Sequence, residues 1–217
     1  MTARQDLVLW GASGQARVLN ELVSDSPWRI CALVDNRPLT SPIAGIPVLV
    51  GVEGLDIWLK TRAADRPLFG AVAVGGSRGA DRLQLLETLA SRGIEIVTLV
   101  HRTAFIANDS DIGNGSQVLA NACVCSHARI GQGVIINTSA SVDHDCIVED
   151  GVHIAPGARL AGAVTVGARA FVGIGAVVLP RLIIGADAVI GAGAVVTRSV
   201  PPGCTVVGNP ARPLIKN

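Results

Sequence analysis

Aliphatic residues recur at every sixth position through the second half of the chain, and this period restricts the possible folds more than any other feature. The series runs without a break from Ile106 to Val196, over sixteen positions. A series of small apolar residues lies two positions before it, from Ala122 to Ala194, with Leu182 as its bulky member. Both series are predicted to point inward.

A period of six fits neither the roughly 3.6-residue repeat of an α-helix nor the two-residue alternation of an ordinary strand. Each hexad is therefore interpreted as a short strand and a turn, with three strands in each triangular coil and the coils stacked as in a solenoid. In six hexads a glycine directly follows the aliphatic position, where we expect a corner that needs a permissive backbone and close stacking of coils. These glycines are Gly113, Gly131, Gly167, Gly173, Gly185 and Gly191. The period predicts a left-handed parallel β-helix of about five coils.

The first hundred residues show alternating strand and helix patterns instead. Apolar runs predict strands at 7–9, 30–35, 69–76 and 94–100. Helices are predicted after the first strand, where Val18, Leu19, Leu22 and Val23 share one face, near 55–60, and over about 79–92. This alternation is typical of a small parallel sheet that binds ligands at the carboxyl ends of its strands. We predict two domains, an α/β domain at 1–101 and the β-helix with a C-terminal tail at 102–217.

Composition excludes several classes of protein. The formal net charge is +1, from 18 basic and 17 acidic residues, without a basic block, so nucleic-acid binding is not expected. No apolar run reaches the roughly 18 to 20 residues of a membrane span, and the N-terminus does not resemble a signal peptide. We expect a soluble, cytoplasmic protein. The five scattered cysteines lack paired spacing, which predicts reduced and mostly buried thiols.

A glycine turn follows the first predicted strand. Gly11, Ser13 and Gly14 belong to the sequence GASG, and Asp35 ends the second strand. This turn could hold a phosphate at the N-terminus of the next helix, with Asp35 reaching a ribose. The full dinucleotide fingerprint is absent, so a nucleotide site and a plain structural turn both stay open.

Two histidines and one cysteine are the candidates for chemistry on the β-helix. His144 lies between two aspartates and two residues past an inward valine, so it is expected to project outward as a general base or as an ordinary surface residue. His153 is expected to be exposed or to line the same groove. Cys146 occupies the small inward register and is predicted to be a packed thiol. A zinc site would need a third converging imidazole, which the spacing does not provide.

Six segments along the chain carry a resemblance to a known family. They are GASG (11–14), VD (34–35), VGG (74–76), NTSASVDHDC (137–146), VHIAPGARLAG (152–162) and VGNPA (207–211). In this order they resemble the bacterial sugar acetyltransferases that join a Rossmann-like nucleotide-sugar domain to a left-handed β-helix. That group includes nucleotide 4-amino-sugar N-acetyltransferases and relatives of sialic acid O-acetyltransferases.

The resemblance implies an acetyl-CoA-dependent N-acetyltransferase that uses no metal and acts on the 4-amino group of a nucleotide-linked sugar. It implies a homotrimer with active sites between subunits. His144 would be the catalytic base and Asp145 the residue that orients it. The resemblance implies substrate binding by Gly11, Ser13, Gly14, Asp35, Gly75 and Asn137. It implies acetyl-CoA binding by His153, Gly162, Ile174 and Ala192.

Three other functions stay open, and a γ-type zinc hydratase on the β-helix is the third of them. A sugar O-acetyltransferase, acting on a sialic acid-type hydroxyl, would use the same histidine. A non-catalytic trimeric scaffold that binds a ligand through its first domain would not need His144, Asp145 or Asn137.

Overall fold

The computed structural model of the protein describes residues 4–62 and 66–214. These residues form two compact units. Unit 1 comprises the described residues up to Val74 together with Gln84–Val97, and unit 2 comprises Gly75–Leu83 and the described residues from Thr98 onward. Gly75–Leu83, a stretch inside the predicted range 1–101, therefore belongs with the coils.

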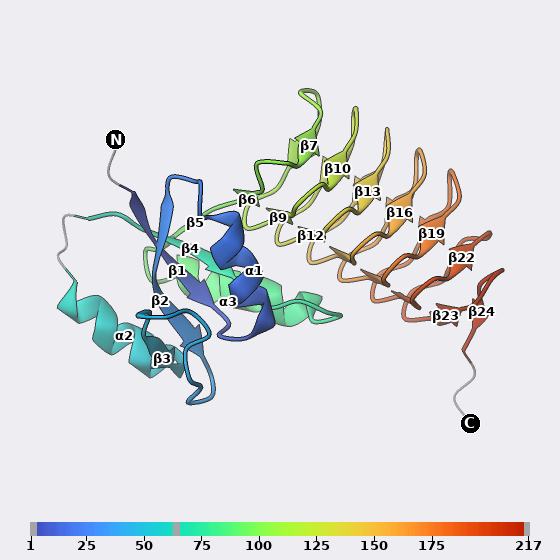
Figure 1. The fold of residues 1–217 in the computed structure, drawn as a ribbon. Helices are drawn as coiled ribbons and strands as arrows, with labels where there is room; N and C mark the ends of the chain where they lie inside the picture. Colours follow the sequence, from blue (N-terminus) through green and yellow to red (C-terminus); the bar gives the residue numbers. More distant parts are fainter. Residues whose placement is uncertain (1–3, 63–65, 215–217) are drawn as a thin grey trace. The chain divides into compact units, whose positions relative to one another are not determined.

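Unit 1 is built on a five-stranded parallel sheet with the strand order β3-β2-β1-β4-β5 (Figure 1). Its strands are β1 (Gln5–Trp10), β2 (Trp28–Asp35), β3 (Val48–Val50), β4 (Leu68–Val72) and β5 (Glu95–Ile96). The helices are α1 (Gly14–Leu22), α2 (Gly51–Thr61) and α3 (Gly79–Ala90), the last of which begins in unit 2. The continuous apolar run of β1 is buried throughout its second half, as expected for a strand covered on both faces.

The predicted apolar face of α1 is partly wrong. The helix buries Ala16, Leu19 and Leu22, whereas Val18 is 39% exposed. Val18 is one residue from Leu19, which places it about 100° around the helix and at the edge of the buried stripe. The sequence pattern also missed β3, a strand of only three residues directly after Pro47.

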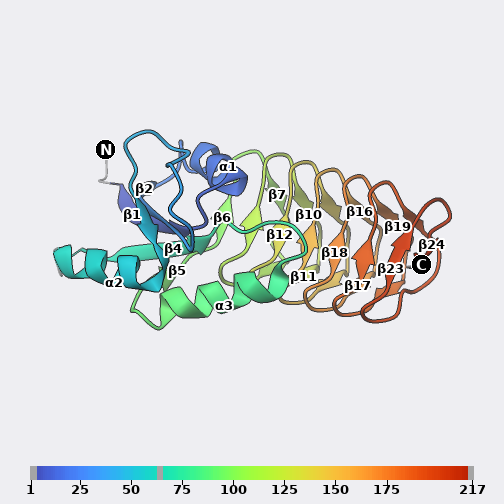
Figure 2. The same cartoon turned by 90° about the horizontal axis from the view of Figure 1, so that it is seen from below.

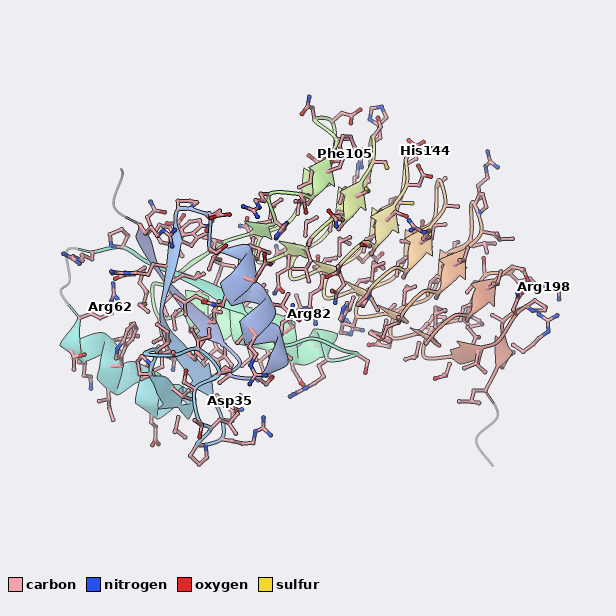
Figure 3. All side chains as sticks on the ribbon, in the orientation of Figure 1. Asp35, Arg62, Arg82, Phe105, His144 and Arg198 are labelled. Carbon is pink, nitrogen blue, oxygen red and sulfur yellow. The ribbon has the colours of Figure 1, made fainter. Side chains whose placement is uncertain are left out.

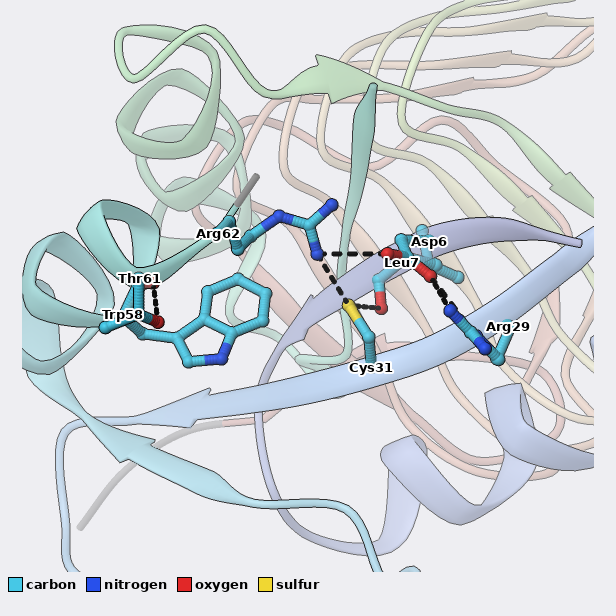
Figure 4. Close-up of polar contacts among 7 residues, drawn as sticks. All are labelled: Asp6, Leu7, Arg29, Cys31, Trp58, Thr61 and Arg62. Atoms are coloured by element: carbon cyan, nitrogen blue, oxygen red, sulfur yellow. Dashed lines mark hydrogen bonds and ion pairs between the residues drawn. The ribbon is translucent and has the colours of Figure 1, made fainter. Parts of the chain in front are cut away.

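A polar cluster in unit 1 joins β1, β2 and the end of α2 (Figure 4). The carboxylate of Asp6 accepts hydrogen bonds from Arg29 and Arg62, and the Arg62 guanidinium also lies 5.2 Å from the centre of the Trp58 ring. Burial raises the pKa of Asp6, but these hydrogen bonds lower it, so the pKa lies below its usual range. Burial raises the pKa of the neighbouring Cys31 thiol to about 11, and the thiol is therefore protonated and unreactive.

Unit 2 is a left-handed parallel β-helix with three sheets, as predicted (Figure 2). The first sheet contains β7 (Phe105–Ile106), β10 (Cys123–Val124), β13 (Ser141–Val142), β16 (Arg159–Leu160), β19 (Val177–Val178) and β22 (Val195–Val196). The second contains β8 (Asp111–Ile112), β11 (Arg129–Ile130), β14 (Ile147–Val148), β17 (Thr165–Val166) and β20 (Ile183–Ile184). The third contains β6 (Leu99–Val100), β9 (Gln117–Val118), β12 (Ile135–Ile136), β15 (His153–Ile154), β18 (Phe171–Val172), β21 (Val189–Ile190), β23 (Thr205–Val207) and the antiparallel β24 (Arg212–Pro213).

Both inward series form the core of this β-helix. Within these series, only the first members, Ile106 and Ile112, and Leu182 are partly buried. The strand predicted over 94–100 is wrong as one element. It is split into β5 of unit 1 and β6 of the β-helix. The hydrogen-bond partners change between two adjacent residues, since the Val97 N–H donates to the Gly70 carbonyl in unit 1, whereas the Thr98 hydroxyl donates to the Gly113 carbonyl in the coils.

The corner glycines serve one of their two predicted purposes. A side chain at Gly113 or Gly167 would meet the backbone of the next coil, which confirms close stacking. Their backbone is not in the left-handed region, however. That conformation occurs two residues later, at every sixth residue from Gly115 to Gly193. Eight non-glycine residues adopt it there, so the turn geometry is imposed by the coil and not by glycine. No helix within the described ranges has the length and apolar character of a membrane span.

Candidate functional site

His144 lies in the turn between β13 and β14, and its imidazole points away from the coil (Figure 3). Its side chain is 59% exposed, which confirms the predicted outward direction. The ring Nδ1 lies 2.7 Å from a carboxylate oxygen of Asp145. This hydrogen bond raises the pKa of His144, Asp143 adds to the effect, and desolvation and Arg181 oppose it. With Nδ1–H donated to Asp145, Nε2 is the nitrogen free to accept a proton.

The coil backbone fixes the Asp145 side chain beside the ring. Asp145 occupies the left-handed position of its turn with φ +58°, and its N–H donates to the carbonyl of Ser126 one coil earlier. The carboxylate of Asp143 accepts the His144 backbone N–H at 2.7 Å. The two aspartates therefore have separate tasks, because one holds the turn and the other holds the imidazole.

Gly162 lies in the equivalent turn of the next coil, directly beside the imidazole. A Cβ atom at this position would overlap with Nε2 of His144. A side chain at this position would displace the ring from the place it occupies. Among the hydrogen bonds of the described residues, none uses the Gly162 N–H, although the adjacent Ala163 N–H donates to the His144 carbonyl. A backbone donor is thus available next to the basic nitrogen.

His153 is buried, and the expectation that it is exposed is wrong. Only 5% of the residue is accessible, because Gly75–Leu83 belongs to unit 2 and covers this side of β15. Its Nδ1 lies 3.1 Å from the Gly76 carbonyl, and its Nε2 lies 3.0 Å from the amide nitrogen of Asn137. Since the Asn137 oxygen accepts the Thr138 N–H, the Asn137 nitrogen donates to His153. His153 is therefore neutral with its proton on Nδ1.

The glycine turn of unit 1 brings together most of the residues predicted to bind the nucleotide. Gly11 has φ +120°, and any side chain there would overlap with the Ala73 carbonyl. Ser13 and Gly14 are exposed at the start of α1, and the Ser13 hydroxyl makes no cap hydrogen bond. The Asp35 carboxylate accepts the Ala12 N–H at 3.2 Å, which holds the end of β2 beside this turn. Gly75 is half-buried and belongs to unit 2.

The Hexapep family model, described as bacterial transferase hexapeptide (six repeats), matches residues 127–162 and 163–198. Perosamine N-acetyltransferase from Caulobacter crescentus, solved as a histidine-to-asparagine variant with CoA and GDP-perosamine, is 33% identical to the chain. The two structures have a TM-score of 0.89, and the match covers 99% of each chain. The chain belongs to the bacterial hexapeptide-repeat sugar acetyltransferases.

Two further members of this acetyltransferase family also match over nearly the whole length of both chains. The acetyltransferase domain of PglB from Neisseria gonorrhoeae FA1090, solved with acetyl coenzyme A, is 33% identical with a TM-score of 0.85, over 98% of this chain and 100% of its own. WeeI from Acinetobacter baumannii AYE is 32% identical with a TM-score of 0.84, over 97% of this chain and 100% of its own. The comparison with curated proteins gave no match. The solved relatives and the family model show that the protein is an acyltransferase.

The remaining predicted cofactor residues of this acetyltransferase lie at another corner of the coils. Ile174 and Ala192 are both exposed and occupy the same place in successive turns, tied by a hydrogen bond from the Gly193 N–H to the Ile174 carbonyl. This corner and the corner of His144 and Gly162 are the two ends of the first sheet's strands. The structure thus separates the four predicted cofactor residues into Gly162 beside His144, the pair at the second corner, and the buried His153.

Arg82 belongs to the same unit and was missed by the sequence pattern. It is fully buried, and it donates to the carbonyls of Gly133 at 2.5 Å and Gly151 at 2.6 Å (Figure 3 labels Arg82). Burial lowers the pKa of its guanidinium to about 10. A side chain at Gly79 would overlap with the same Gly151 carbonyl, so Gly75–Leu83 lies against the coils with little space. An arginine in a helical pattern gives no sequence signal for such a role, because arginine is normally exposed.

The thiols do not form a site. Cys146 is buried in the core, as predicted, and its thiol donates to the Ala161 carbonyl. Desolvation raises its pKa to about 11. The other four cysteines are only half-buried, so the expectation of mostly buried thiols is wrong for them. Within 4–62 and 66–214, no group of three or more potential metal ligands occurs.

We expect acid to destabilise the protein through His153. Burial lowers its pKa from 6.5 to about 4, so the unfolded chain binds the proton that the folded chain excludes. This contribution to stability is complete above about pH 7 and is lost as the pH falls toward 4, with about 2 kcal/mol lost by pH 5. Denaturant unfolding at several pH values measures it. The dependence should be weaker in His153→Gln and unchanged in His127→Ala; an equal slope in all three proteins would contradict the assignment.

Proposed function

We propose that this enzyme transfers an acetyl group from acetyl-CoA to the 4-amino group of a nucleotide-linked amino sugar. The observation that carries the proposal is the exposed His144, whose Nδ1 is held by Asp145 at 2.7 Å while Nε2 faces Gly162. The perosamine N-acetyltransferase relative, which was solved with CoA and GDP-perosamine, supports the substrate class. In two structures of that relative a single histidine had been replaced, by asparagine and by alanine.

The reaction is direct acyl transfer in which His144 acts as the base. The neutral amino group of the sugar attacks the thioester carbonyl, and Nε2 of His144 takes the proton that the amine loses. The imidazolium that forms is paired with the Asp145 carboxylate. We assign stabilisation of the oxyanion of the tetrahedral intermediate to the Gly162 N–H, which has no acceptor among the described residues. Collapse of the intermediate breaks the carbon–sulfur bond and releases CoA as a thiolate, without a covalent enzyme intermediate.

We also propose binding roles for residues of each unit, on the basis of the resemblance to the family. We assign the nucleotide phosphates to the turn of Gly11, Ser13 and Gly14, the ribose to Asp35, and a further substrate contact to Gly75. Asn137 would contact the acceptor sugar with the N–H that it does not give to His153. Both ring nitrogens of His153 are occupied, so we assign His153 to the orientation of Asn137 and not to direct contact with acetyl-CoA.

The remaining assignments concern acetyl-CoA and the assembly. We place acetyl-CoA against Gly162 at one corner and against Ile174 and Ala192 at the other; the two corners border the first sheet of the β-helix. We also propose a homotrimer with the active sites between subunits. Large apolar side chains on the outer faces of the coils, at Ile147 and Ile183, support burial of these faces by other copies. Light scattering after size-exclusion chromatography tests the trimer.

The experiment that tests the function is a thiol-release assay with acetyl-CoA and a panel of acceptors. The panel contains UDP-, dTDP- and GDP-linked 4-amino sugars, with free sialic acid alongside. Turnover on one amino sugar is expected and identifies its nucleotide. Release only with a hydroxyl acceptor would replace the N-acetyltransferase with an O-acetyltransferase, and no release with any acceptor would favour a scaffold.

The pH dependence of the reaction tests whether Asp145 controls the basicity of His144. Because the hydrogen bond to Asp145 raises the pKa of His144, its removal in Asp145→Asn should lower that pKa. The base is active when unprotonated, so the acidic limb of kcat/KM should move to lower pH. The maximal kcat should fall at the same time, since a weaker base has lost its orienting partner. An acidic limb that stays at the wild-type position would show that Asp145 does not control His144.

A further inference from the structure

A cavity of about 550 Å³ opens in unit 1, at the edge where the strands of the parallel sheet begin. It is lined by the C-terminal ends of α2 and α3 and by the start of β4, and its apolar lining includes the buried Leu68 and Ile94. None of the described residues that line it is acidic, whereas several are basic. The basic lining residues are Lys60, Arg62, Arg66 and Arg92. The cavity therefore surrounds apolar side chains with positive charge.

A second cavity, of about 530 Å³, adjoins the first, because Arg66 lines both. It extends to the starts of β1 and β2, where Arg4 and Arg29 add further positive charge. Its described lining has one acidic residue, Asp6, whose carboxylate already accepts hydrogen bonds from Arg29 and Arg62. The two adjoining cavities are thus lined by far more basic than acidic side chains, and both belong to unit 1.

Two basic side chains of the first cavity are held in place by aspartates. Arg92 donates through Nε to Asp56 at 2.7 Å. Arg62 donates through Nη1 to Asp6 at 3.1 Å, and its guanidinium lies 5.2 Å from the centre of the Trp58 ring (Figure 4). The Nε and Nη2 atoms of Arg62 have no acceptor within the described ranges. An arginine that is oriented in advance and keeps unused N–H groups loses little conformational freedom when it binds an anion.

The other two basic side chains of the first cavity are exposed. Lys60 and Arg66 form no hydrogen bond or ion pair with any residue that the structure describes. Lys60 lies in the last turn of α2, where a positive charge also offsets the helix dipole. This explanation does not apply to Arg66, which lies outside the helices, two residues before β4. Its charge stands instead where the two cavities meet.

We propose that this edge of unit 1 binds a soluble anion with linked phosphate groups. The first cavity has a volume typical of small-ligand sites, which is roughly 300–1,000 Å³. Arginine forks match phosphate oxygens, and basic residues spread over two adjoining cavities suit several linked phosphates better than one.

This site is distinct from the glycine turn that we assign to the nucleotide-linked sugar. All strands of the unit 1 sheet are parallel, so they begin at one edge and end at the other. Gly11 and Asp35 lie at or just after the ends of β1 and β2, whereas Arg66 and Leu68 lie at the start of β4. The anion site is therefore independent of the proposed acetyl transfer.

Calorimetric titration of the full chain with pyrophosphate tests the site. The variants are Lys60→Gln, Arg66→Gln and the double variant, whose exposed side chains hold no other described group. Each single substitution should weaken pyrophosphate binding about fivefold, which is near the upper value for an ion pair at an exposed position. The double variant should bind roughly 25-fold more weakly if the two effects add. Orthophosphate should bind the wild type more weakly than pyrophosphate does.

The matched control removes two charges from exposed positions on the coils, as the double variant Arg129→Gln with Arg159→Gln, and should bind pyrophosphate as the wild type does. Equal weakening in both double variants would overturn the site, because only net charge would matter. Unchanged binding in the Lys60 and Arg66 double variant would overturn it too, since pyrophosphate would then bind elsewhere. Orthophosphate binding as tightly as pyrophosphate would contradict the requirement for linked phosphates.

Vesicles of phosphatidylglycerol distinguish a soluble ligand from a membrane surface. The soluble anion predicts that the wild type binds pyrophosphate and that pyrophosphate binding is unaffected by uncharged phosphatidylcholine vesicles. Co-sedimentation with phosphatidylglycerol vesicles without any binding of pyrophosphate would overturn the proposal, because the same basic residues would then meet lipid headgroups. Binding of neither probe would also overturn it.

Discussion

Replacement of His144 by alanine is expected to lower kcat by on the order of 10²-fold or more, while the fold and substrate binding are preserved. The magnitude is that of general base catalysis lost from an acyl transfer. The ring is exposed and, among the described residues, makes its side-chain hydrogen bond only with Asp145, so its removal leaves no buried group there unsatisfied. The KM for acetyl-CoA should therefore stay near the wild-type value. Thiol release under saturating substrates measures the effect.

His127→Ala is the matched control for this prediction. His127 occupies a turn at the same corner one coil earlier, is exposed, and lies 3.6 Å from a carboxylate oxygen of Asp109. It thus shares the exposure and acidic neighbour of His144, but no glycine in the described part of the chain packs against its ring. Its removal should leave kcat unchanged. Near-normal turnover in His144→Ala, or equal losses in both variants, would refute the assignment of the base.

The sequence was sufficient to predict the β-helix because one constraint recurs in each hexad. An inward residue of this solenoid has nearly the same surroundings in every coil, so position alone determines its burial. Cys146 illustrates this, since its register predicted a packed thiol and the structure buries it completely. The same reasoning placed His144 outside. In unit 1 the pattern identified the helices and most of the strands but missed β3, and it failed at Val18, where a single position at the edge of a helix face decides exposure.

Sequence reasoning failed where one part of the chain covers another part distant in sequence. Periodicity places His153 on the outer face of β15, which is correct, but it says nothing about what lies over that face. The covering segment Gly75–Leu83 is 70 or more residues away and has no period in common with the coils. Arg82 fixes this segment, and helical spacing cannot distinguish a buried arginine from a solvated one. The hydrogen bond from His153 to Gly76 was thus unpredictable for the same reason.

Arg82→Met is expected to lower the free energy of unfolding by about 3 kcal/mol. Two opposing effects decide its size. Methionine removes a guanidinium whose burial is unfavourable, as its lowered pKa shows, and this offsets part of the loss. The carbonyls of Gly133 and Gly151, however, lose their charged donor in a buried place, and each unsatisfied acceptor costs roughly 1–3 kcal/mol. The unsatisfied carbonyls prevail because methionine fills the space but has no N–H to donate.

Removal of the Arg82 guanidinium should also change the surroundings of His153. Without Arg82, Gly75–Leu83 is held less firmly, the Gly76 carbonyl moves from Nδ1, and water gains access to the ring. The pKa of His153 should then rise from about 4 toward its ordinary value, which histidine NMR titration detects. Arg129→Met, on an exposed face of the coils, should change stability by less than about 0.5 kcal/mol and leave this pKa unaltered. If Arg82→Met were as stable as Arg129→Met, the carbonyls must be satisfied without it, and Arg82 would not be what holds the segment on the coils.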